Sequence, residues 1–262
     1  MKHSVLAALL AAAFLLHVPE PVWAGGTISG FVRYHGEPLS AKRRPVTVDA
    51  AECGPEAVLE ELALGKRGGV VNAVISLQGP AEGGRALSEP SGGFVLRHKK
   101  CRLEPSVLIV APGRDVSVLN EDRLNHSLVS MGRTNPPVSI AQPKGVSRVS
   151  VRFDHPETFE VRCGIHDWEK AWIVVAENPY YALSNAEGFF EIRDIPAGDY
   201  MAAFWHEALG LETRRVMVRE GENLKLDFSL KQLRSQSFPQ DPYISQNISR
   251  LDVNILPIRL VK

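Results

Sequence analysis

Short runs that alternate apolar and polar residues recur along this chain and end at turn-forming residues. Residues 27–36 (TISGFVRYHG), 148–153 (RVSVRF) and 158–163 (TFEVRC) show this two-residue period, and residues 106–122 (SVLIVAPGRDVSVLNED) give two such runs around a Pro-Gly turn. Alternation places the apolar side chains on one face of a strand. Several short strands with frequent turns are typical of β-sandwiches and barrels. We therefore predict an all-β fold.

The first 24 residues have the pattern of a cleaved secretory signal. Lys2 is followed by an apolar stretch at residues 5–16, and Val22-Trp23-Ala24 precedes the expected cleavage point. Such a stretch is too short to span a bilayer comfortably. We expect residues 1–24 to be removed, with a mature chain from Gly25, a periplasmic or secreted location, and no membrane insertion.

The charge balance gives no reason to expect a nucleic-acid partner. The chain has 30 acidic and 30 basic residues. Binding to a phosphate backbone or to an anionic membrane surface normally requires a basic excess on the domain. Neither nucleic acid nor a membrane surface is therefore expected as a partner.

Three cysteines in an exported chain favour one disulfide and one thiol kept for other chemistry. Cys53 (AECGPE) and Cys101 (KKCRLEP) lie in polar, loop-like contexts, whereas Cys163 has His166 close behind it. We therefore expect a Cys53–Cys101 disulfide, which would stabilise the fold by about 4 kcal/mol through loop entropy. The sequence leaves open the pairings that would use Cys163.

The pattern of the chain changes after Val175. Residues 177–231 contain closely spaced strands and turns, as in YYALSNAEGFFEIRDIPAGDY, and are expected to form a small second β-sandwich. Residues 232–262 begin as a polar tail without a core pattern, and only 251–260 (LDVNILPIRL) has the pattern of one more strand. The first domain would then comprise residues 25–176.

Three residues of the first domain form a metal-binding pattern. His126 begins an apolar run, and Cys163 and His166 lie on a later loop in VRCGIHDWEKAWIVV. Two imidazoles and one thiolate are the trigonal donor set of electron-transfer copper sites. Thiolate suits Cu(I) and imidazole suits both oxidation states, so copper is the expected cofactor.

In these motifs the chain resembles the cupredoxins, most closely the amicyanin type. That family has an asparagine, five residues and the first ligand histidine, matching Asn120 and His126; its later loop has cysteine, histidine and methionine, matching Cys163, His166 and the position of Glu169. The resemblance implies a Greek-key sandwich over residues 25–176.

The second module resembles transthyretin-like, carboxypeptidase regulatory-like domains, on the basis of residues 185–200 (NAEGFFEIRDIPAGDY). The tandem resembles exported proteins described as methylamine-utilisation or plastocyanin-like proteins.

Two positions depart from the cupredoxin pattern. Ser127 stands where the family has an asparagine that ties the ligand loops, and Glu169 stands where the axial methionine is expected. A carboxylate is a harder donor than a thioether, so it should favour Cu(II), lower the potential and make the site more favourable for zinc. Two alternatives remain: an empty site with Glu169 turned to solvent, and Met131 as a substitute axial donor.

The expected function is single-electron transfer, with His126, Cys163 and His166 as equatorial ligands and Glu169 axial. By the resemblance, an exposed edge of His166 would pass electrons to a c-type cytochrome or another periplasmic redox protein. An enzyme is not expected, because a Cys163–His166 nucleophile pair would lack an orienting group and an oxyanion pocket.

The alternative function is that of a non-enzymatic exported interaction or structural protein with a vestigial metal site. Four other conspicuous residues are expected to be structural. His206 and Glu207 would shape a turn, and Trp168 and Trp172 would pack in the core.

Overall fold

A computed structural model of the chain describes residues 25–37, 39–79, 87–130 and 132–231. The expected signal peptide (1–24), the polar tail (232–262) and Met131 lie outside the described residues. Among the described helices, none has the length and apolarity needed to cross a membrane. The regular secondary structure of the described residues is almost entirely β-strand, as the sequence predicts.

The elements follow in chain order: β1 (Gly26–Tyr34), β2 (Lys42–Pro45), α1 (Ala50–Cys53), β3 (Glu56–Leu59), the 3₁₀ turn η1 (Lys66–Gly68), β4 (Val74–Gln78), β5 (Phe94–His98), β6 (Leu103–Glu104), β7 (Val107–Val110), β8 (Arg114–Asn120), β9 (His126–Ser130), β10 (Val138–Gln142), β11 (Arg148–Phe153), β12 (Glu157–Arg162), β13 (Lys170–Val175), β14 (Tyr181–Leu183), β15 (Phe189–Ile195), β16 (Gly198–His206), β17 (Gly210–Val218), β18 (Asn223–Lys225) and β19 (Phe228–Leu230).

Strands β5 to β13 form one sandwich, which we call the inserted sandwich. Its two sheets have the orders β10-β9-β12-β13-β7 and β11-β8-β5-β6. Alternate residues of the facing strands enclose an apolar core that includes Phe94, Leu96, Val118, Leu128 and Phe153. The strand patterns noted in the sequence at 106–122, 148–153 and 158–163 are confirmed.

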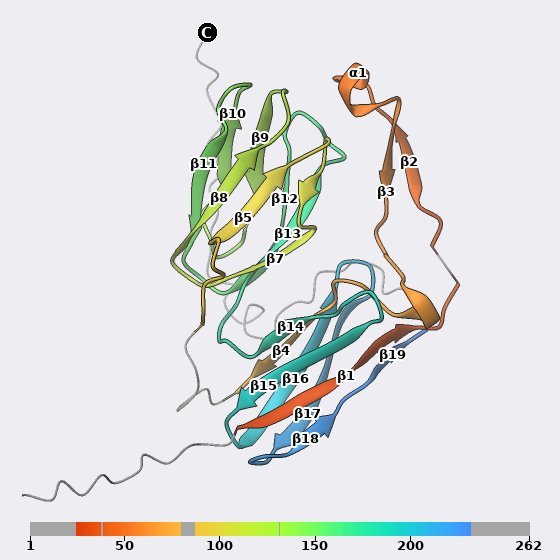
Figure 1. Cartoon of the computed structure of the whole chain (residues 1–262), viewed down its shortest axis with the longest axis vertical. Helices are drawn as coiled ribbons and strands as arrows, with labels where there is room; N and C mark the ends of the chain where they lie inside the picture. The colour runs from red at the N-terminus through yellow and green to blue at the C-terminus, as the bar shows by residue number, and fades with distance from the viewer. Residues whose placement is uncertain (1–24, 38, 80–86, 131, 232–262) are drawn as a thin grey trace, which may run out of the picture.

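The remaining long strands form a second sandwich, which we call the flanking sandwich. Its strands come from the segments that precede and follow the inserted sandwich in the sequence. One sheet has the order β15-β1-β18 with β19 also paired to β1, and the other has the order β14-β4-β16-β17. Its core contains Ile28, Phe190, Phe204 and Phe228, all nearly inaccessible to solvent. Figure 1 shows the two sandwiches stacked one above the other.

The grouping of β1 and β4 corrects the predicted division of the chain at residue 176. Strand β1 pairs antiparallel with β15, with Ile28 opposite Ile192, and parallel with β18 and β19. Strand β4 pairs with β14 and β16. Residues 25–79 therefore do not belong with the inserted sandwich. The sequence did not predict this pairing, because alternation fixes which face of a strand is buried but not which strand lies beside it.

Strand β13 joins the two sandwiches because both of its faces are covered. Ala171, Ile173 and Val175 belong to the core of the inserted sandwich, whereas Trp172 and Val174 belong to a second apolar cluster with Val74 of β4. The Trp172 and Trp205 rings meet edge to face at 4.9 Å. A strand covered on both faces has a continuous apolar sequence, as AWIVV has.

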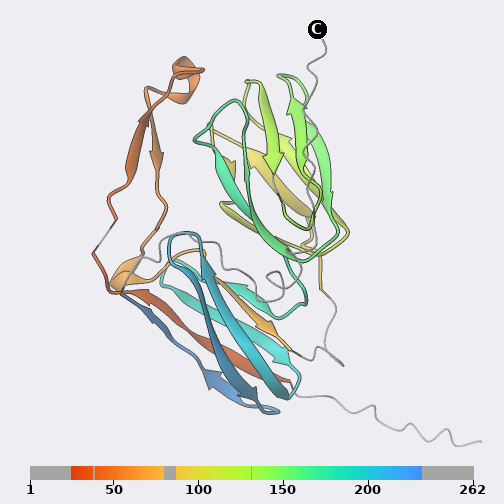
Figure 2. The same cartoon turned by 180° about the vertical axis from the view of Figure 1, so that it is seen from behind.

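A hairpin arm projects from the flanking sandwich and runs beside the inserted sandwich (Figures 1 and 2). It consists of β2, α1 and β3, and β2 pairs with β3 in register from Lys42–Leu59 to Pro45–Glu56. At its tip, Cys53 is bonded to Cys101 of the inserted sandwich, with Cα atoms 5.6 Å apart. The predicted Cys53–Cys101 disulfide is confirmed, and Cys163 is a free, buried thiol.

The position of β1 in the flanking sandwich predicts that truncating Ile28, a core residue of this strand, destabilises that sandwich. Ile28→Ala should lower the free energy of unfolding of the flanking sandwich by about 2–5 kcal/mol, because it opens a cavity in that core. Hydrogen exchange should accelerate in β15 to β19 more than in β9 and β12. Thr27→Ala, on the neighbouring half-exposed position, is the matched control. Acceleration confined to β9 and β12 would contradict the observed pairing.

Candidate metal centre

Strand ends and one loop of the inserted sandwich carry the candidate site. His98 is the last residue of β5, His126 is the first residue of β9, and Cys163, His166 and Glu169 lie in the loop from β12 to β13. Side chains of all five are at most 1 % exposed. The structure thus brings together the four residues that the sequence singles out, His126, Cys163, His166 and Glu169, and adds His98 to them.

Backbone hydrogen bonds hold the loop from β12 to β13 in a tight turn. The Cys163 amide donates to the Glu169 carbonyl at 3.0 Å, and the Glu169 amide donates to the His166 carbonyl at 2.9 Å. The Gly164 amide also donates to Ser127 Oγ at 2.9 Å. Ser127 therefore ties this loop to β9, although it stands where the resemblance leads us to expect asparagine.

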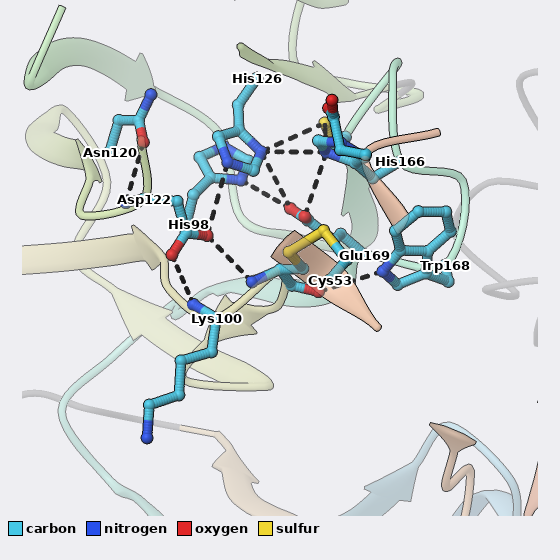
Figure 3. Close-up of a disulfide and its surroundings, with 12 residues drawn as sticks. Cys53, His98, Lys100, Asn120, Asp122, His126, His166, Trp168 and Glu169 are labelled. Carbon is cyan, nitrogen blue, oxygen red and sulfur yellow. Dashed lines mark hydrogen bonds and ion pairs between the residues drawn. A yellow bond between two sulfur atoms is a disulfide. The ribbon is translucent and has the colours of Figure 1, made fainter. Parts of the chain in front are cut away.

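Figure 3 shows the side chains of His126, His166 and Glu169 directed toward one another. Cys163 Sγ lies 3.8 Å from His126 Nδ1 and 3.7 Å from His166 Nδ1. The two Nδ1 atoms lie 3.2 Å apart. Glu169 adds its carboxylate, with Oε1 3.2 Å from His166 Nδ1 and Oε2 3.4 Å from His126 Nδ1.

These separations fit donors that surround one metal ion. In zinc sites the metal lies about 2.0 Å from imidazole nitrogen and about 2.3 Å from thiolate sulfur. At these metal–ligand distances, a nitrogen and a sulfur at a trigonal angle about the metal are about 3.7 Å apart. Two imidazole nitrogens at a slightly smaller angle about the metal are about 3.2 Å apart. Glu169 Oε1 is buried and makes no hydrogen bond beyond its 3.2 Å approach to His166 Nδ1, so it is available as a donor at the same centre. The residues present therefore fit a metal ion.

His98 is a member of the cluster that the sequence motifs did not predict. Its Nδ1 lies 2.8 Å from Glu169 Oε2, and its ring stacks on the His126 ring at 4.2 Å between centroids. The donor atoms of His98, His126, Cys163 and Glu169 all lie within 4.8 Å of one another. The signal was present in the alternation of FVLRH, where Phe94, Leu96 and His98 share the buried face.

The outer nitrogen of each ligand-like histidine faces a carboxylate. Asp122 Oδ2 lies 3.5 Å from His126 Nε2 and accepts a hydrogen bond from the Cys101 amide, whereas Oδ1 of the same carboxylate accepts one from the Lys100 amide. Asp49 Oδ2, on the arm, accepts a hydrogen bond from His166 Nε2 at 3.0 Å. The hydrogen bond to Asp49 selects the His166 tautomer that leaves Nδ1 free for a metal, whereas Asp122 faces His126 Nε2 without a hydrogen bond.

The edge of His166 is not exposed, contrary to expectation. Its side chain has 0 % exposure, because Asp49 covers Nε2 and the Trp168 ring lies 5.1 Å away between centroids. The expectation failed because the covering residue comes from the arm, 117 positions away in sequence. Glu169 is buried among the histidines, so the alternative in which it turns to solvent is wrong.

Mutual hydrogen bonding sets the protonation of the metal-free cluster. Burial alone would lower the pKa of both imidazoles, but bonds with Cys163 and Glu169 raise the pKa of His126 to about 9 and that of His166 to about 10. Burial would raise the pKa of the Cys163 thiol, yet its bonds to the two histidines lower it to about 5. The pKa of Glu169 is likewise lowered, by His126, His166 and His98 against the effect of burial.

Other singled-out residues have structural positions. Asn120 orders the turn before His126, since its Nδ2 donates to the Leu124 carbonyl at 3.0 Å. Trp168 is packed in the core as expected, with Nε1 donating to the Cys101 carbonyl. His206 Nδ1 accepts from the Ala208 amide within a turn, as predicted.

Trp172 and Glu207 join the two sandwiches. Trp172 is buried, as expected, and its Nε1 donates to Glu207 Oε2 at 3.0 Å. The same carboxylate oxygen accepts from Lys170 Nζ at 2.6 Å. Glu207 therefore bonds across the contact between the sandwiches, a role that its position in a turn did not predict.

Comparisons with known proteins find structural neighbours for part of the chain. No family model and no curated protein matches it. A methionine-to-alanine variant of amicyanin in its Cu(I) form has a TM-score of 0.30 and 20 % identity, over 38 % of this chain and 99 % of that one. A reduced tryptophan-to-tyrosine variant of amicyanin gives the same values.

A copper-containing nitrite reductase from Thermus scotoductus SA-01 has a TM-score of 0.29 and 26 % identity, and covers 38 % of this chain. The match spans only 25 % of that reductase chain. At these TM-scores the similarity adds no argument about the site, whose assignment therefore depends on its own donor atoms.

The bonded cluster predicts an acidic thiol in the metal-free protein. Thiolate ultraviolet absorbance should appear with a midpoint near pH 5, because the two histidines stabilise the anion. The thiolate is therefore present at neutral pH and is protonated only as the pH falls below this value. Cys163→Ser removes the signal and is the control, since the other two cysteines form the disulfide. A midpoint near the unperturbed value of about 8.5 would contradict the arrangement.

Proposed function

We propose that the protein is a cupredoxin-like copper protein that transfers single electrons. His126 Nδ1, His166 Nδ1 and Cys163 Sγ would be the equatorial ligands, and a Glu169 oxygen would be axial. The observation that carries this proposal is the convergence of three soft or borderline donors and one carboxylate in a buried centre. Copper bound there would supply a one-electron couple between Cu(I) and Cu(II).

Rigid support of the ligands favours electron transfer. His166 is held by a hydrogen bond to the outer carboxylate of Asp49, and Asp122 lies 3.5 Å from His126 Nε2. Cys163 and Glu169 are linked through the backbone, and His98 bonds Glu169. Ligands held in this way need little rearrangement when the charge of the metal changes. Displacement of the imidazole protons at Nδ1 would accompany metal binding, since metal ligands must be deprotonated.

An exported location is part of the same proposal. The charge pattern and apolar stretch at residues 1–24 and the Cys53–Cys101 disulfide both fit an oxidising compartment such as the periplasm. A c-type cytochrome or another periplasmic redox protein would then be the electron partner.

Zinc is the second candidate, and one observation favours it. Glu169 supplies a hard oxygen donor, which completes a four-coordinate set of two nitrogens, one sulfur and one oxygen that zinc accepts. A zinc site would have no redox function, and the chain would then be an exported binding or structural protein.

Copper binding can be tested by the visible spectrum of the purified protein. Cu(II) should bind at one ion per chain and produce intense thiolate-to-copper absorption, because Cys163 is a ligand. Cys163→Ser should abolish this absorption. Absence of the band in the unmodified protein, with zinc retained instead by elemental analysis, would reject the electron-transfer proposal in favour of the second candidate.

The axial assignment of Glu169 predicts the effect of replacing it with methionine, the residue that cupredoxins have at this position. Glu169→Met should raise the reduction potential and move the spectrum toward that of blue copper proteins, because a neutral thioether stabilises Cu(II) less than a carboxylate does. Glu187→Met, at an exposed turn of the flanking sandwich, is the control. If neither the potential nor the spectrum changes, Glu169 is not a ligand.

A further inference from the structure

The arm contributes a side chain to the candidate metal centre from the flanking sandwich. Asp49 lies at the arm tip and accepts a hydrogen bond from His166 Nε2 at 3.0 Å. Its carboxylate side chain is 35 % exposed, whereas the imidazole beneath it is fully buried. Asp49 therefore forms the outer wall of the site at the edge where His166 would otherwise meet solvent.

The backbone at Asp49 has the left-handed conformation. Its φ of 53° and ψ of 33° are left-handed, a region that aspartate and asparagine adopt more readily than most residues. The Cys53 amide donates to the Asp49 carbonyl at 2.9 Å, so the carboxylate and the disulfide belong to one turn. The Cys53–Cys101 disulfide therefore fixes the position of Asp49 relative to the inserted sandwich.

Two further contacts hold the tip of the arm in place. Val46 and Ala57 of the arm pack in a buried cluster with Leu124 and Trp168 of the inserted sandwich. Arg44 forms an ion pair at 2.7 Å with Asp167, which follows the proposed ligand His166 in the sequence. Strand β2 pairs with β3, and no described pairing joins either strand to the inserted sandwich. The tip is thus held by side chains and the disulfide.

We propose that Asp49 is a positioning residue of the metal centre, carried by the flanking sandwich and fixed by the Cys53–Cys101 disulfide. This inference rests on the proposed function. Asp49 holds His166 with Nδ1 toward the metal, closes the outer edge of the ring to solvent, and places a second negative charge near the site. It gives the flanking sandwich a task in the copper chemistry, since the arm that bears Asp49 belongs to it.

The first test uses the metal-free protein, so that it does not depend on copper. Histidine nitrogen–proton correlation spectra should show a slowly exchanging proton on His166 Nε2. This protection should be lost in Asp49→Ala and in the double variant Cys53→Ser, Cys101→Ser. Glu52→Ala, at an exposed position of the same tip, is the control and should retain it. Unchanged protection in Asp49→Ala would overturn the proposal.

The second test uses the copper-loaded protein. Asp49→Ala and the double cysteine variant should each weaken copper affinity by about 10–100-fold, the usual effect of losing a carboxylate behind a ligand histidine. Asp49→Asn keeps an acceptor but removes the charge, so its loss of affinity should be smaller and its reduction potential should rise. Glu52→Ala should change neither quantity.

The outcomes separate this inference from the proposed function. If the unmodified protein binds copper but the Asp49 variants leave affinity and potential unchanged, the positioning role of Asp49 is wrong and the copper site stands. If the unmodified protein binds no copper, the proposed function fails and this role toward copper fails with it. The exchange measurement still decides whether the arm covers His166.

Discussion

The buried carboxylate of Glu169 is the constraint around which the inserted sandwich is arranged. A charge removed from water is costly unless it is paired and hydrogen-bonded. Glu169 meets this requirement through three imidazoles, His98 at 2.8 Å, His166 at 3.2 Å and His126 at 3.4 Å. These partners come from β5, β9 and the loop before β13, so the pairing of one carboxylate fixes the relative positions of three segments that are distant in sequence.

The flanking sandwich supports the same centre from outside. Trp172 and Trp205 join the two sandwiches at one point, and Lys170 and Glu207 add an ion pair beside them. The arm makes the second connection, through the disulfide and through Asp49. The sandwiches are thus attached at two places, and a residue carried by one, Asp49, lies at hydrogen-bond distance from His166 of the other.

Much of the strand structure and most of the site could be predicted from the sequence, because both depend on local patterns. Alternation identified the strands, and the spacing of Cys163, His166 and Glu169 on one loop kept them close whatever the rest of the fold. The pairing of β1 with β15, β18 and β19 could not be predicted in this way, since it depends on contacts between segments that are far apart in the sequence. The covering of His166 by Asp49 was missed for the same reason.

The central claim is that His126, Cys163, His166 and Glu169 hold one copper ion beneath the arm. Crystals of the copper-loaded protein, measured at the copper absorption edge, test it directly. The account predicts a single anomalous peak at the point shared by the two Nδ1 atoms and Cys163 Sγ, with a Glu169 oxygen also coordinated. A peak elsewhere, or a peak at this point with Glu169 directed away from the metal, would contradict it.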